Sequence, residues 1–371
     1  MGKALKLTFP RTVRVGPGSI EHLGEEAAAL GRRALLVTGR GALRRAGITD
    51  RMLRLLRASG VEADVFEDVP PEPDVLTVDR VRQRLKGRDL VIEAGGGSAM
   101  DAGKAAAALA RADAPTAEYL HGRDAPPSGL PHIAVPTTAG TGAEVTPNSV
   151  LIDPARMVKK SIRGGGGILP TACIVDGDLT LSCPPHVTAA SGMDALAQAM
   201  ESYVSIHAVP TTEALSLAAV EMIAAHLPVA FAHGEDRAAR AAMLEASFMA
   251  GLAFANARLG AVHGLAHPLG LIYEQPHGVV CAILLPAVVR LNAPAVAAKW
   301  ERLRAAMGGD PAAKVEQLLD GLKLPRRFKR RLAADEEKML LDYALNAGSS
   351  KANPVPVDEA YVRAVMDAVC P

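Results

Sequence analysis

Two polar side chains stand four residues apart in an otherwise Ala-rich stretch in the second half of the chain. Asp194 and Gln198 would share one face of a helix, with Glu201 on the next turn. Taken alone, this spacing is typical of a solvated helix face. Joined by imidazoles from elsewhere in the chain, the same face could hold a metal ion.

A cluster of histidines is the second feature that could do chemistry. His263 and His267 repeat the four-residue spacing and His277 follows ten residues later, so three of the ten histidines fall within fifteen residues. Neutral imidazoles together with a carboxylate suit Fe²⁺ or Zn²⁺, whereas an all-oxygen site would suit Mg²⁺ or Ca²⁺. The pattern therefore predicts a divalent metal site. His267 could be a ligand of that site, a proton relay or a core histidine.

A glycine-rich segment lies between an apolar run at 89–93 and an Ala-rich helical pattern at 100–110. Its members are Gly95, Gly96, Gly97, Ser98 and Asp101. Glycines let a diphosphate approach the backbone closely, and the beginning of a helix offers unpaired N–H groups to an anion. The alternative is an ordinary turn in which Ser98 or Asp101 only caps the helix. The order strand, glycines, helix favours phosphate binding, although the GxGxxG fingerprint is absent.

A second polar loop follows the strand expected at 132–136. It carries hydroxyl groups at Thr137, Thr138 and Thr141. On its own this loop could be structural. Because ligands of α/β proteins collect at the carboxyl ends of parallel strands, two such loops at one edge of a sheet predict a dinucleotide site.

The elements that would position these loops alternate along the first half of the chain. Strands are expected at 34–38, 62–66, 89–93, 132–136, 149–153 and 173–175, with helices at 20–30, 49–58, 75–86 and 100–110. Residues 5–15 predict a hairpin or an edge strand, and the glycine run at 163–167 predicts a short loop. Strands that alternate with helices indicate an α/β domain with a parallel sheet.

The second half has a different pattern. From residue 187 onward, Ala, Leu and Met recur at helical spacing with almost no β-branched alternation. We therefore expect an α/β dinucleotide-binding domain at 1–180 and an all-helical domain at 181–371 that carries the metal and the substrate. The length agrees, because at roughly 150 residues per domain a chain of 371 residues makes about two domains.

Composition excludes several classes of protein. The formal charge is +1 and aromatics make up only 3%, which disfavours binding to nucleic acid. With 49% hydrophobic and 22% charged residues the chain can bury a large core. Four separated cysteines form no CxxC pair or disulfide framework, and no uninterrupted apolar stretch reaches roughly the 18 residues of a membrane span. The expectation is a cytoplasmic protein without a membrane partner.

Five segments carrying these residues resemble the iron-containing (group III) alcohol dehydrogenase family, within the superfamily of dehydroquinate synthase-like folds. They are GGGSAMDAGK, PTTAGTGAEVT, SGMDALAQAMESYVS, GAVHGLAHPLG and PHGVVCAILLP, and NPVPV at 353–357 resembles the family's C-terminal Asn-Pro element. The resemblance covers nearly the whole chain. It implies an N-terminal α/β nucleotide-binding domain and an all-α C-terminal domain.

The resemblance also implies the metal ligands. Carried over to this chain, they are Asp194, Gln198, His263 and His277. Gln198 departs from the family pattern, in which a histidine is usual at this position. A neutral amide oxygen is a poorer donor than imidazole for Fe²⁺ or Zn²⁺, so we expect weaker or altered metal binding.

The nucleotide contacts that the resemblance implies add further positions. The glycine segment and Asp101 would contact the diphosphate. The three threonines of the second loop would also contact the nucleotide, and Lys160 would point toward the ribose. Many NAD-preferring members carry an acidic residue after the first strand, where this chain has Gly39 and Arg40. Without that carboxylate there is room for a 2′-phosphate, so NAD(P)(H) with a preference for NADP(H) is expected.

The activity implied is hydride transfer between a nicotinamide and a small primary alcohol or aldehyde. In the family, the position of His267 lies close to the nicotinamide, which makes this residue the candidate proton relay. A homodimer is usual. The alternatives are a metal-free reductase of the maleylacetate reductase type, a lyase of the dehydroquinate synthase type, and a nucleotide-binding protein without catalysis.

Overall fold

The computed structural model describes residues 6–163 and 167–371. Contacts between residues divide the described chain into two compact units, an α/β unit of residues 9–138 and 142–182 and a helical unit of residues 6–8, 139–141 and 183–371. Sequence reasoning expected one division near residue 180. The structure places the main division after Ser182 and assigns two short segments of the first half to the helical unit.

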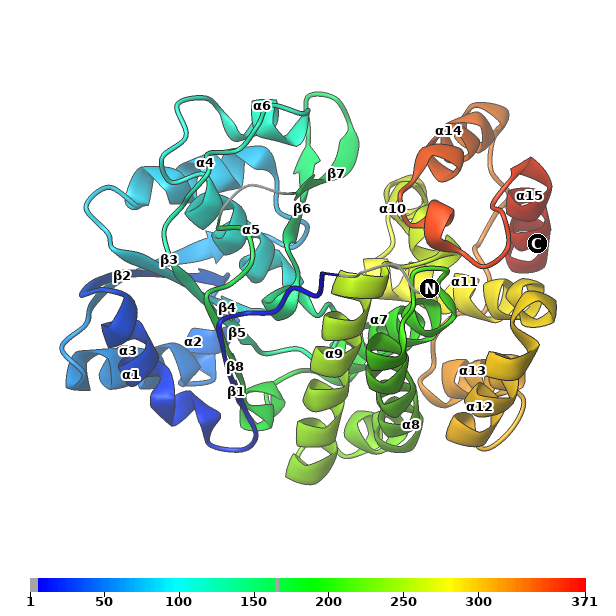
Figure 1. Ribbon diagram of the computed structural model, residues 1–371, viewed down its shortest axis with the longest axis horizontal. Coiled ribbons are helices and arrows are strands. Elements are labelled where there is room, and N and C mark those ends of the chain that lie inside the picture. Colours follow the sequence, from blue (N-terminus) through cyan, green and yellow to red (C-terminus); the bar gives the residue numbers. More distant parts are fainter. Residues whose placement is uncertain (1–5, 164–166) are drawn as a thin grey trace. The chain divides into compact units, whose positions relative to one another are not determined.

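A six-stranded sheet forms the centre of the α/β unit (Figure 1). Its strands, in spatial order, are β1 (Thr12–Val15), β8 (Ala172–Val175), β5 (His132–Pro136), β4 (Leu90–Gly95), β2 (Arg33–Gly39) and β3 (Glu62–Val69). Every pairing between them is parallel, as the alternating pattern predicts. The segment at 5–15 forms the edge strand β1 and not a hairpin, because β1 pairs in parallel with β8.

Helices cover both faces of this sheet, and alternate strand residues point to the two layers. Leu35 and Val37 of β2 join the core under α4 and α5, whereas Ala34 and Leu36 join the core under α1 and α3. The first layer holds α4 (Val75–Arg84), α5 (Gly97–Ala108) and α6 (Thr116–Leu120), and the second holds α1 (Leu23–Leu30), α2 (Ala42–Arg45) and α3 (Ile48–Ala58). Burial on both sides accounts for the continuous apolar runs in these strands.

Two strands lie outside the parallel sheet. β6 (Asn148–Asp153) and β7 (Val158–Arg163) pair antiparallel as a separate ribbon. The strand expected at 149–153 is therefore present but belongs to this ribbon, and sequence reasoning missed both β7 and the short α6. Most of the glycine loop expected at 163–167 lies outside the described residues.

The carboxyl ends of β2 and β4 mark the point where the chain changes direction. From β2 the chain leads outward to β3, and from β4 it leads to β5 on the opposite side. Open α/β sheets bind their ligands beside such a switch point. The loops that begin at Gly39 and Gly95 therefore flank the expected place of a ligand.

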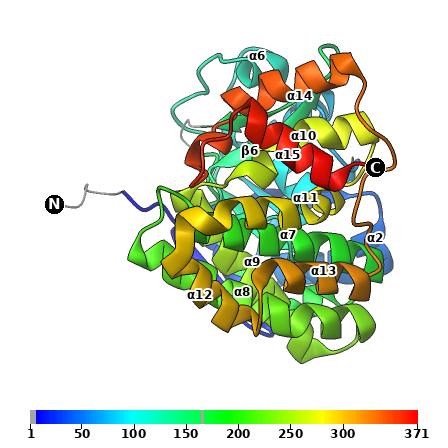
Figure 2. The same cartoon turned by 90° about the vertical axis from the view of Figure 1, so that its right-hand side faces the viewer.

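The helical unit contains the remaining long helices (Figure 2). They are α7 (Pro185–Val204), α8 (Pro210–Ala232), α9 (Arg237–Ala257), α10 (Ala261–Tyr273), α11 (His277–Asn292), α12 (Ala297–Met307), α13 (Pro311–Gly321), α14 (Ala334–Asn346) and α15 (Glu359–Val369). Short 3₁₀ helices in the chain are η1 (Ser19–His22), η2 (Ala143–Val145), η3 (Gly177–Thr180), η4 (Ala293–Val296) and η5 (Ser350–Ala352).

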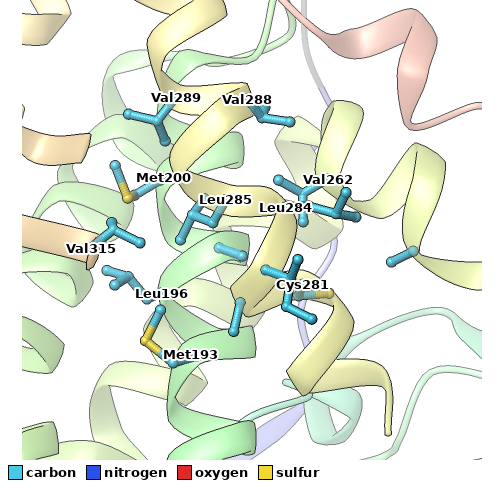
Figure 3. Packing of buried hydrophobic residues seen from close by; sticks show 14 of the residues in the cluster. Met193, Leu196, Met200, Val262, Cys281, Leu284, Leu285, Val288, Val289 and Val315 are labelled. Atoms are coloured by element: carbon cyan, nitrogen blue, oxygen red, sulfur yellow. The ribbon is translucent and has the colours of Figure 1, made fainter. Parts of the chain in front are cut away.

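α7 and α11 pack against each other in the core of this unit (Figure 3). Met193, Leu196 and Met200 of α7 are buried in one cluster with Leu284 and Leu285 of α11. This packing fixes the rotation of both helices about their axes. Polar residues on the neighbouring positions of these helices are therefore held in a defined direction.

Within residues 6–163 and 167–371, three helical segments are long and apolar enough to cross a membrane by length and composition: Pro210–Ala232, Arg237–Ala257 and His277–Gly321. Sequence reasoning expected none of that length. Their apolar residues, among them Leu227, Met243 and Leu284, belong to the core of the helical unit. Burial in the fold accounts for part of their composition, since 33%, 50% and 61% of the three apolar windows are buried.

Candidate metal centre and nucleotide site

The polar face of α7 is buried. Asp194, Gln198 and Glu201 are each 3% exposed, so they do not form the solvated helix face that their spacing alone suggested. The close approach of α8 helps to enclose this helix, because a Cβ at Gly192 would lie 2.3 Å from Leu227 Cδ1. Three buried polar side chains on one helix need partners from elsewhere in the fold.

Two of these partners are the imidazoles of α10 and α11. His263 Nε2 lies 3.2 Å from Asp194 Oδ1, and His277 Nε2 lies 3.8 Å from the same oxygen. The structure therefore brings together the carboxylate and two of the histidines that the sequence indicated. The His277 side chain is 22% exposed against 5% for His263, so the cluster is open on the His277 side.

A thiol belongs to the same cluster. Cys281 Sγ lies 3.6 Å from His277 Nε2 and 4.0 Å from His263 Nε2. One donor atom from each of Asp194, His263, His277 and Cys281 lies within 4.8 Å of all the others. Sequence reasoning missed Cys281, although its four-residue spacing from His277 on α11 was a signal.

The donor set fits a divalent cation. One carboxylate, two imidazoles and a thiol are donors that suit Zn²⁺ or Fe²⁺. Gln198 Nε2 donates a hydrogen bond to Asp194 Oδ2 at 3.1 Å, which leaves Oδ1 directed at the histidines. Gln198 Oε1 is buried and has no hydrogen-bond partner among the described residues, as expected of an oxygen close to a cation site.

Glu201 holds His263 from the side opposite to Asp194. Its Oε2 lies 2.5 Å from His263 Nδ1, and its Oε1 accepts a hydrogen bond from the Val262 N–H at 2.6 Å. Burial lowers the pKa of His263, but the surrounding acidic groups at Cys281, Glu201 and Asp194 outweigh it and raise that pKa well above the ordinary value. A cation on Nε2 would take the place of that proton, while Nδ1–H would continue to donate to Glu201.

Burial also raises the pKa of Cys281, to about 12. The thiol is therefore neutral by itself at physiological pH. Deprotonation would need a nearby positive charge, and a cation bound to the sulfur supplies one.

The C-terminal Asn-Pro element supports the beginning of α10. Asn353 Oδ1 accepts a hydrogen bond from the Ala261 N–H at 3.2 Å and another from Asn292 Nδ2 at 2.9 Å. Tyr361 donates from its hydroxyl to Asn292 Oδ1 at 3.0 Å. This buried network fixes the first turn of α10, and with it the position of His263.

His267 lies one turn further along α10, outside the four-residue donor group. Its ring stacks on His277, with centroids 5.1 Å apart and planes inclined by 16°, and it meets Tyr343 edge-on at 6.3 Å. The side chain is half-buried. His267 therefore lies next to the cluster. Because it is only half-buried, it is not a core histidine.

In the α/β unit, the glycine segment turns the chain from β4 into α5. Gly95 has φ +147°, and a Cβ there would lie 2.8 Å from Ala99 Cβ, so this position requires glycine. A Cβ at Gly96 would lie 3.2 Å from Thr138 Oγ1, which shows how closely the two loops approach. Gly97 begins α5, and Ser98 Oγ accepts a hydrogen bond from the Glu72 N–H at 3.2 Å.

A buried lysine ties the second loop to the same helix. Lys104 of α5 is 0% exposed, and its Nζ donates to Ala143 O at 2.7 Å and to Thr146 Oγ1 at 2.9 Å. Burial lowers the pKa of Lys104, while Asp101, Glu93 and Glu144 oppose that effect. Burial raises the pKa of Glu144 to about 7 and that of half-buried Asp101 to about 6. Sequence reasoning quoted Lys104 within the motif but assigned it no role.

The other predicted nucleotide contacts belong to different parts of the structure: Thr137 to the α/β unit, Thr141 to the helical unit and Lys160 to β7. Thr137 is buried, and its N–H donates to Gly95 O at 2.9 Å, so the two loops meet directly. Thr141 belongs to the helical unit, where neighbouring Gly140 packs on α7: a Cβ at Gly140 would lie 2.6 Å from Ser191 Cβ. Lys160 is exposed on β7, and the adjacent Lys159 forms an ion pair with Glu72.

A carboxylate does lie near the end of β2, although the sequence after β2 has none. Arg40 Nε donates to Asp68 Oδ1 at 2.9 Å, and Arg80 donates to Asp68 Oδ2 at 2.7 Å. The hydrogen bond from Arg80 lowers the pKa of Asp68 most, and the hydrogen bond from Arg40 lowers it further. Sequence reasoning missed Asp68 because it comes from the neighbouring strand β3. Two arginines on one carboxylate still leave a net positive charge at this edge.

Comparison with known proteins covers both units. Residues 10–177 match the sequence pattern of the family described as iron-containing alcohol dehydrogenase, and residues 188–370 match the C-terminal part of the same family. Long-chain-alcohol dehydrogenase 1 of Geobacillus thermodenitrificans is 37% identical, over 98% of this chain and 96% of that protein.

Solved structures agree with this result. A 1,3-propanediol oxidoreductase is 33% identical with a TM-score of 0.91, over 98% of this chain and 99% of that one. Sulfoacetaldehyde reductase from Bifidobacterium kashiwanohense, in complex with NAD⁺, is 30% identical with a TM-score of 0.90, over 99% of both chains. The chain is therefore a member of the iron-containing alcohol dehydrogenase family.

Proposed function

We propose that this protein is a metal-dependent alcohol dehydrogenase that transfers a hydride reversibly between a nicotinamide nucleotide and a small primary alcohol or its aldehyde. The observation that carries the proposal is the cluster of Asp194, His263 and His277, whose donor atoms converge in a helical unit next to a further histidine. Family membership supports the same reaction.

Asp194, His263 and His277 would hold the cation, Fe²⁺ or Zn²⁺. When bound, such an ion supplies Lewis acidity, which favours alkoxide character on the substrate oxygen during oxidation and polarises the carbonyl during reduction. The protein's own contribution is preorganisation. Glu201 fixes the ring and tautomer of His263, and the open side at His277 leaves room for a substrate.

His267 is the proposed proton relay. Its imidazole is half-buried and stacks on His277, so it reaches from the neighbourhood of the cluster toward solvent. Imidazole is the side chain best suited to take up and release a proton at physiological pH. During alcohol oxidation it would accept the hydroxyl proton, and during reduction it would return one.

The nucleotide would bind at the carboxyl ends of β2, β4 and β5. Backbone N–H groups at the beginning of α5 would hold the diphosphate, with Gly95, Gly96 and Gly97 allowing its close approach. Ser98, Asp101, Thr137, Thr138 and Thr141 are the proposed polar contacts, and Lys160 is proposed for the ribose. These assignments follow from the resemblance and the loop geometry.

NADP(H) is the proposed preferred nucleotide. Arg40 and Arg80 lie together on Asp68 beside the end of β2, where an adenosine ribose is expected. A 2′-phosphate could take over hydrogen bonds from either guanidinium, and its two negative charges would suit the net positive charge there. A homodimer and a cytoplasmic location are also proposed, by analogy with the family.

The test is activity with a panel of short alcohols and aldehydes, using NAD(H) and NADP(H) and measuring bound metal in parallel. We expect turnover that chelation abolishes and that Fe²⁺, Zn²⁺ or Mn²⁺ restores. Full activity at negligible metal content would instead support the metal-free reductase alternative. Turnover without net oxidation or reduction of the nucleotide would contradict the dehydrogenase assignment.

A further inference from the structure

A buried thiol lies beside the candidate cation site. Cys281 is 0% exposed and lies on α11, one turn after His277. Each of two helices thus presents a pair of polar side chains four residues apart, Asp194 with Gln198 on α7 and His277 with Cys281 on α11. His263 of α10 lies between them.

We propose that Cys281 is a ligand of the divalent cation, so that the centre consists of Asp194, His263, His277 and a Cys281 thiolate. This inference rests on the metal dependence proposed above and specifies its ligand set. It replaces Gln198 as the fourth ligand and assigns Gln198 to positioning Asp194.

The distances fit this ligand set. In a tetrahedral site with bonds of about 2.0–2.1 Å to nitrogen or oxygen and about 2.3 Å to sulfur, neighbouring donors lie about 3.3–3.6 Å apart. The separation of Cys281 Sγ from His277 Nε2 is 3.6 Å, and that of Asp194 Oδ1 from His263 Nε2 is 3.2 Å. Two further pairs, at 3.8 and 4.0 Å, need only a small contraction around an ion, and all four donor atoms lie within 4.8 Å of one another.

The charges fit as well. Asp194 is the only anion among the other three ligands, because Glu201 reaches the ion only through His263, so a dication on these three would leave its own ligand set positively charged. A thiolate supplies the second negative charge. The S–H bond breaks as the sulfur–metal bond forms, the proton passes to solvent, and no group is oxidised or reduced.

Gln198 is suited to a positioning role. Its Nε2 already donates to Asp194 Oδ2, which turns Oδ1 toward the histidines. Its amide oxygen is neutral and is a weaker donor for Zn²⁺ than a thiolate. The thiolate also changes the expected preference among metals, because sulfur favours Zn²⁺ over Mn²⁺.

The deciding experiment replaces the metal with Co²⁺, a spectroscopic substitute for Zn²⁺, in the full-length protein without nucleotide. We expect a sulfur-to-cobalt charge-transfer band in the near ultraviolet that Cys281→Ser abolishes. Gln198→Leu, which adds no sulfur, and Cys183→Ser should keep the band. Cys183→Ser is the matched control, because it removes a partly exposed thiol at the beginning of the helical unit.

The outcomes separate the two proposals. Visible Co²⁺ ligand-field bands without a charge-transfer band, or a band that survives in Cys281→Ser, would overturn the thiolate ligand while leaving a metal centre intact. Absence of any Co²⁺ or Zn²⁺ binding in equilibrium dialysis would overturn the metal dependence itself, and the ligand assignment with it.

Two further measurements do not depend on the cobalt spectrum. X-ray absorption of the Zn²⁺-loaded native protein should show one sulfur at about 2.3 Å, and a shell of nitrogen and oxygen alone would overturn the proposal even if Cys281→Ser fails to fold. In chelator competition, Cys281→Ser should weaken Zn²⁺ binding by at least about 10-fold to 100-fold and Mn²⁺ binding much less. Equal losses for both ions would contradict a thiolate ligand.

Discussion

The two candidate sites of this protein are built in different ways. The phosphate site of the α/β unit uses the backbone of one short segment, in which Gly95 and Gly96 admit a ligand to the beginning of α5. The candidate metal centre of the helical unit uses side chains from α7 and from the consecutive helices α10 and α11, which lie far from α7 in the sequence. The first site depends on local chain geometry, and the second depends on how whole helices pack.

This difference determines how each site can vary. A site made of backbone N–H groups tolerates changes in most side chains, provided that no Cβ fills its space. A site made of converging side chains is sensitive to each of them, but it can also exchange one donor for another. In the ligand set proposed above, the amide at Gln198 and the thiol at Cys281 are such a variation, and the following predictions test the contrast.

Loss of a metal ligand should have the largest effect. His277→Ala removes an imidazole from the open side of the cluster, so we expect kcat to fall by at least about 10³-fold, comparable with loss of a main electrostatic group in other enzymes. Nucleotide affinity, measured by fluorescence titration of NADPH, should stay unchanged because the α/β site is separate. His186→Ala, an exposed position on α7, is the control. Full activity of His277→Ala would refute its role.

The buried carboxyl of Glu144 should make stability depend on pH. Its pKa is about 7 in the folded protein against 4.5 ordinarily, so the folded state binds more protons between these values and stability falls as pH rises through them. Glu144→Gln should therefore raise the free energy of unfolding at pH 8, by up to about 3 kcal/mol, and change it little at pH 4.5.

Urea unfolding at both pH values measures this difference, with the exposed loop variant Glu235→Gln as the control. A gain in Glu144→Gln that is the same at both pH values would show that ionisation of the carboxyl is not its cause.

Glu201 should contribute less than a direct ligand. Glu201→Gln removes the negative charge that orients His263, so Zn²⁺ affinity should fall by about 10-fold to 100-fold. Chelator competition gives this value, and Glu213→Gln, which disrupts a surface ion pair with Lys299, is the matched control. If Zn²⁺ affinity does not change, His263 is held by packing alone.

The smallest effect is expected at the end of β2. A Cβ at Gly39 would lie 3.7 Å from Val69 O, so a side chain fits there. Gly39→Asp should reduce the preference for NADPH over NADH by about 10-fold, through repulsion of a 2′-phosphate. The ratio of kcat/KM for the two nucleotides reports this, and Gly39→Asn separates charge from size. An equal change in both variants would rule out the electrostatic explanation.

The sequence predicts elements that depend on local patterns, but it does not predict features that depend on packing. The strand predicted at 132–136 is β5, with the same residues, because a short apolar run bounded by polar turns is a strong local pattern. β7 was missed because VKKSIR is mostly polar and contributes only Ile162 to the buried core.

The same limit applied to the metal centre. Spacing alone placed Asp194 and Gln198 on one helix face, but only the packing of α7 against α11 shows that this face is buried and that Cys281 lies against it. Likewise, Asp68 meets Arg40 because β3 lies beside β2. This contact between neighbouring strands carries no signal in a single sequence, and the spacing of His277 and Cys281 shows only that they share a helix face.

The two oxygens of Glu201 serve different parts of the protein at once. One holds the ring of His263, and the other accepts the Val262 N–H in the first turn of α10. Glu201 thereby links the candidate metal ligand His263 to the first turn of α10. Amide hydrogens at the start of α10 should exchange more slowly with solvent deuterium as the ion binds, so that this short segment would act as a built-in reporter of metal content.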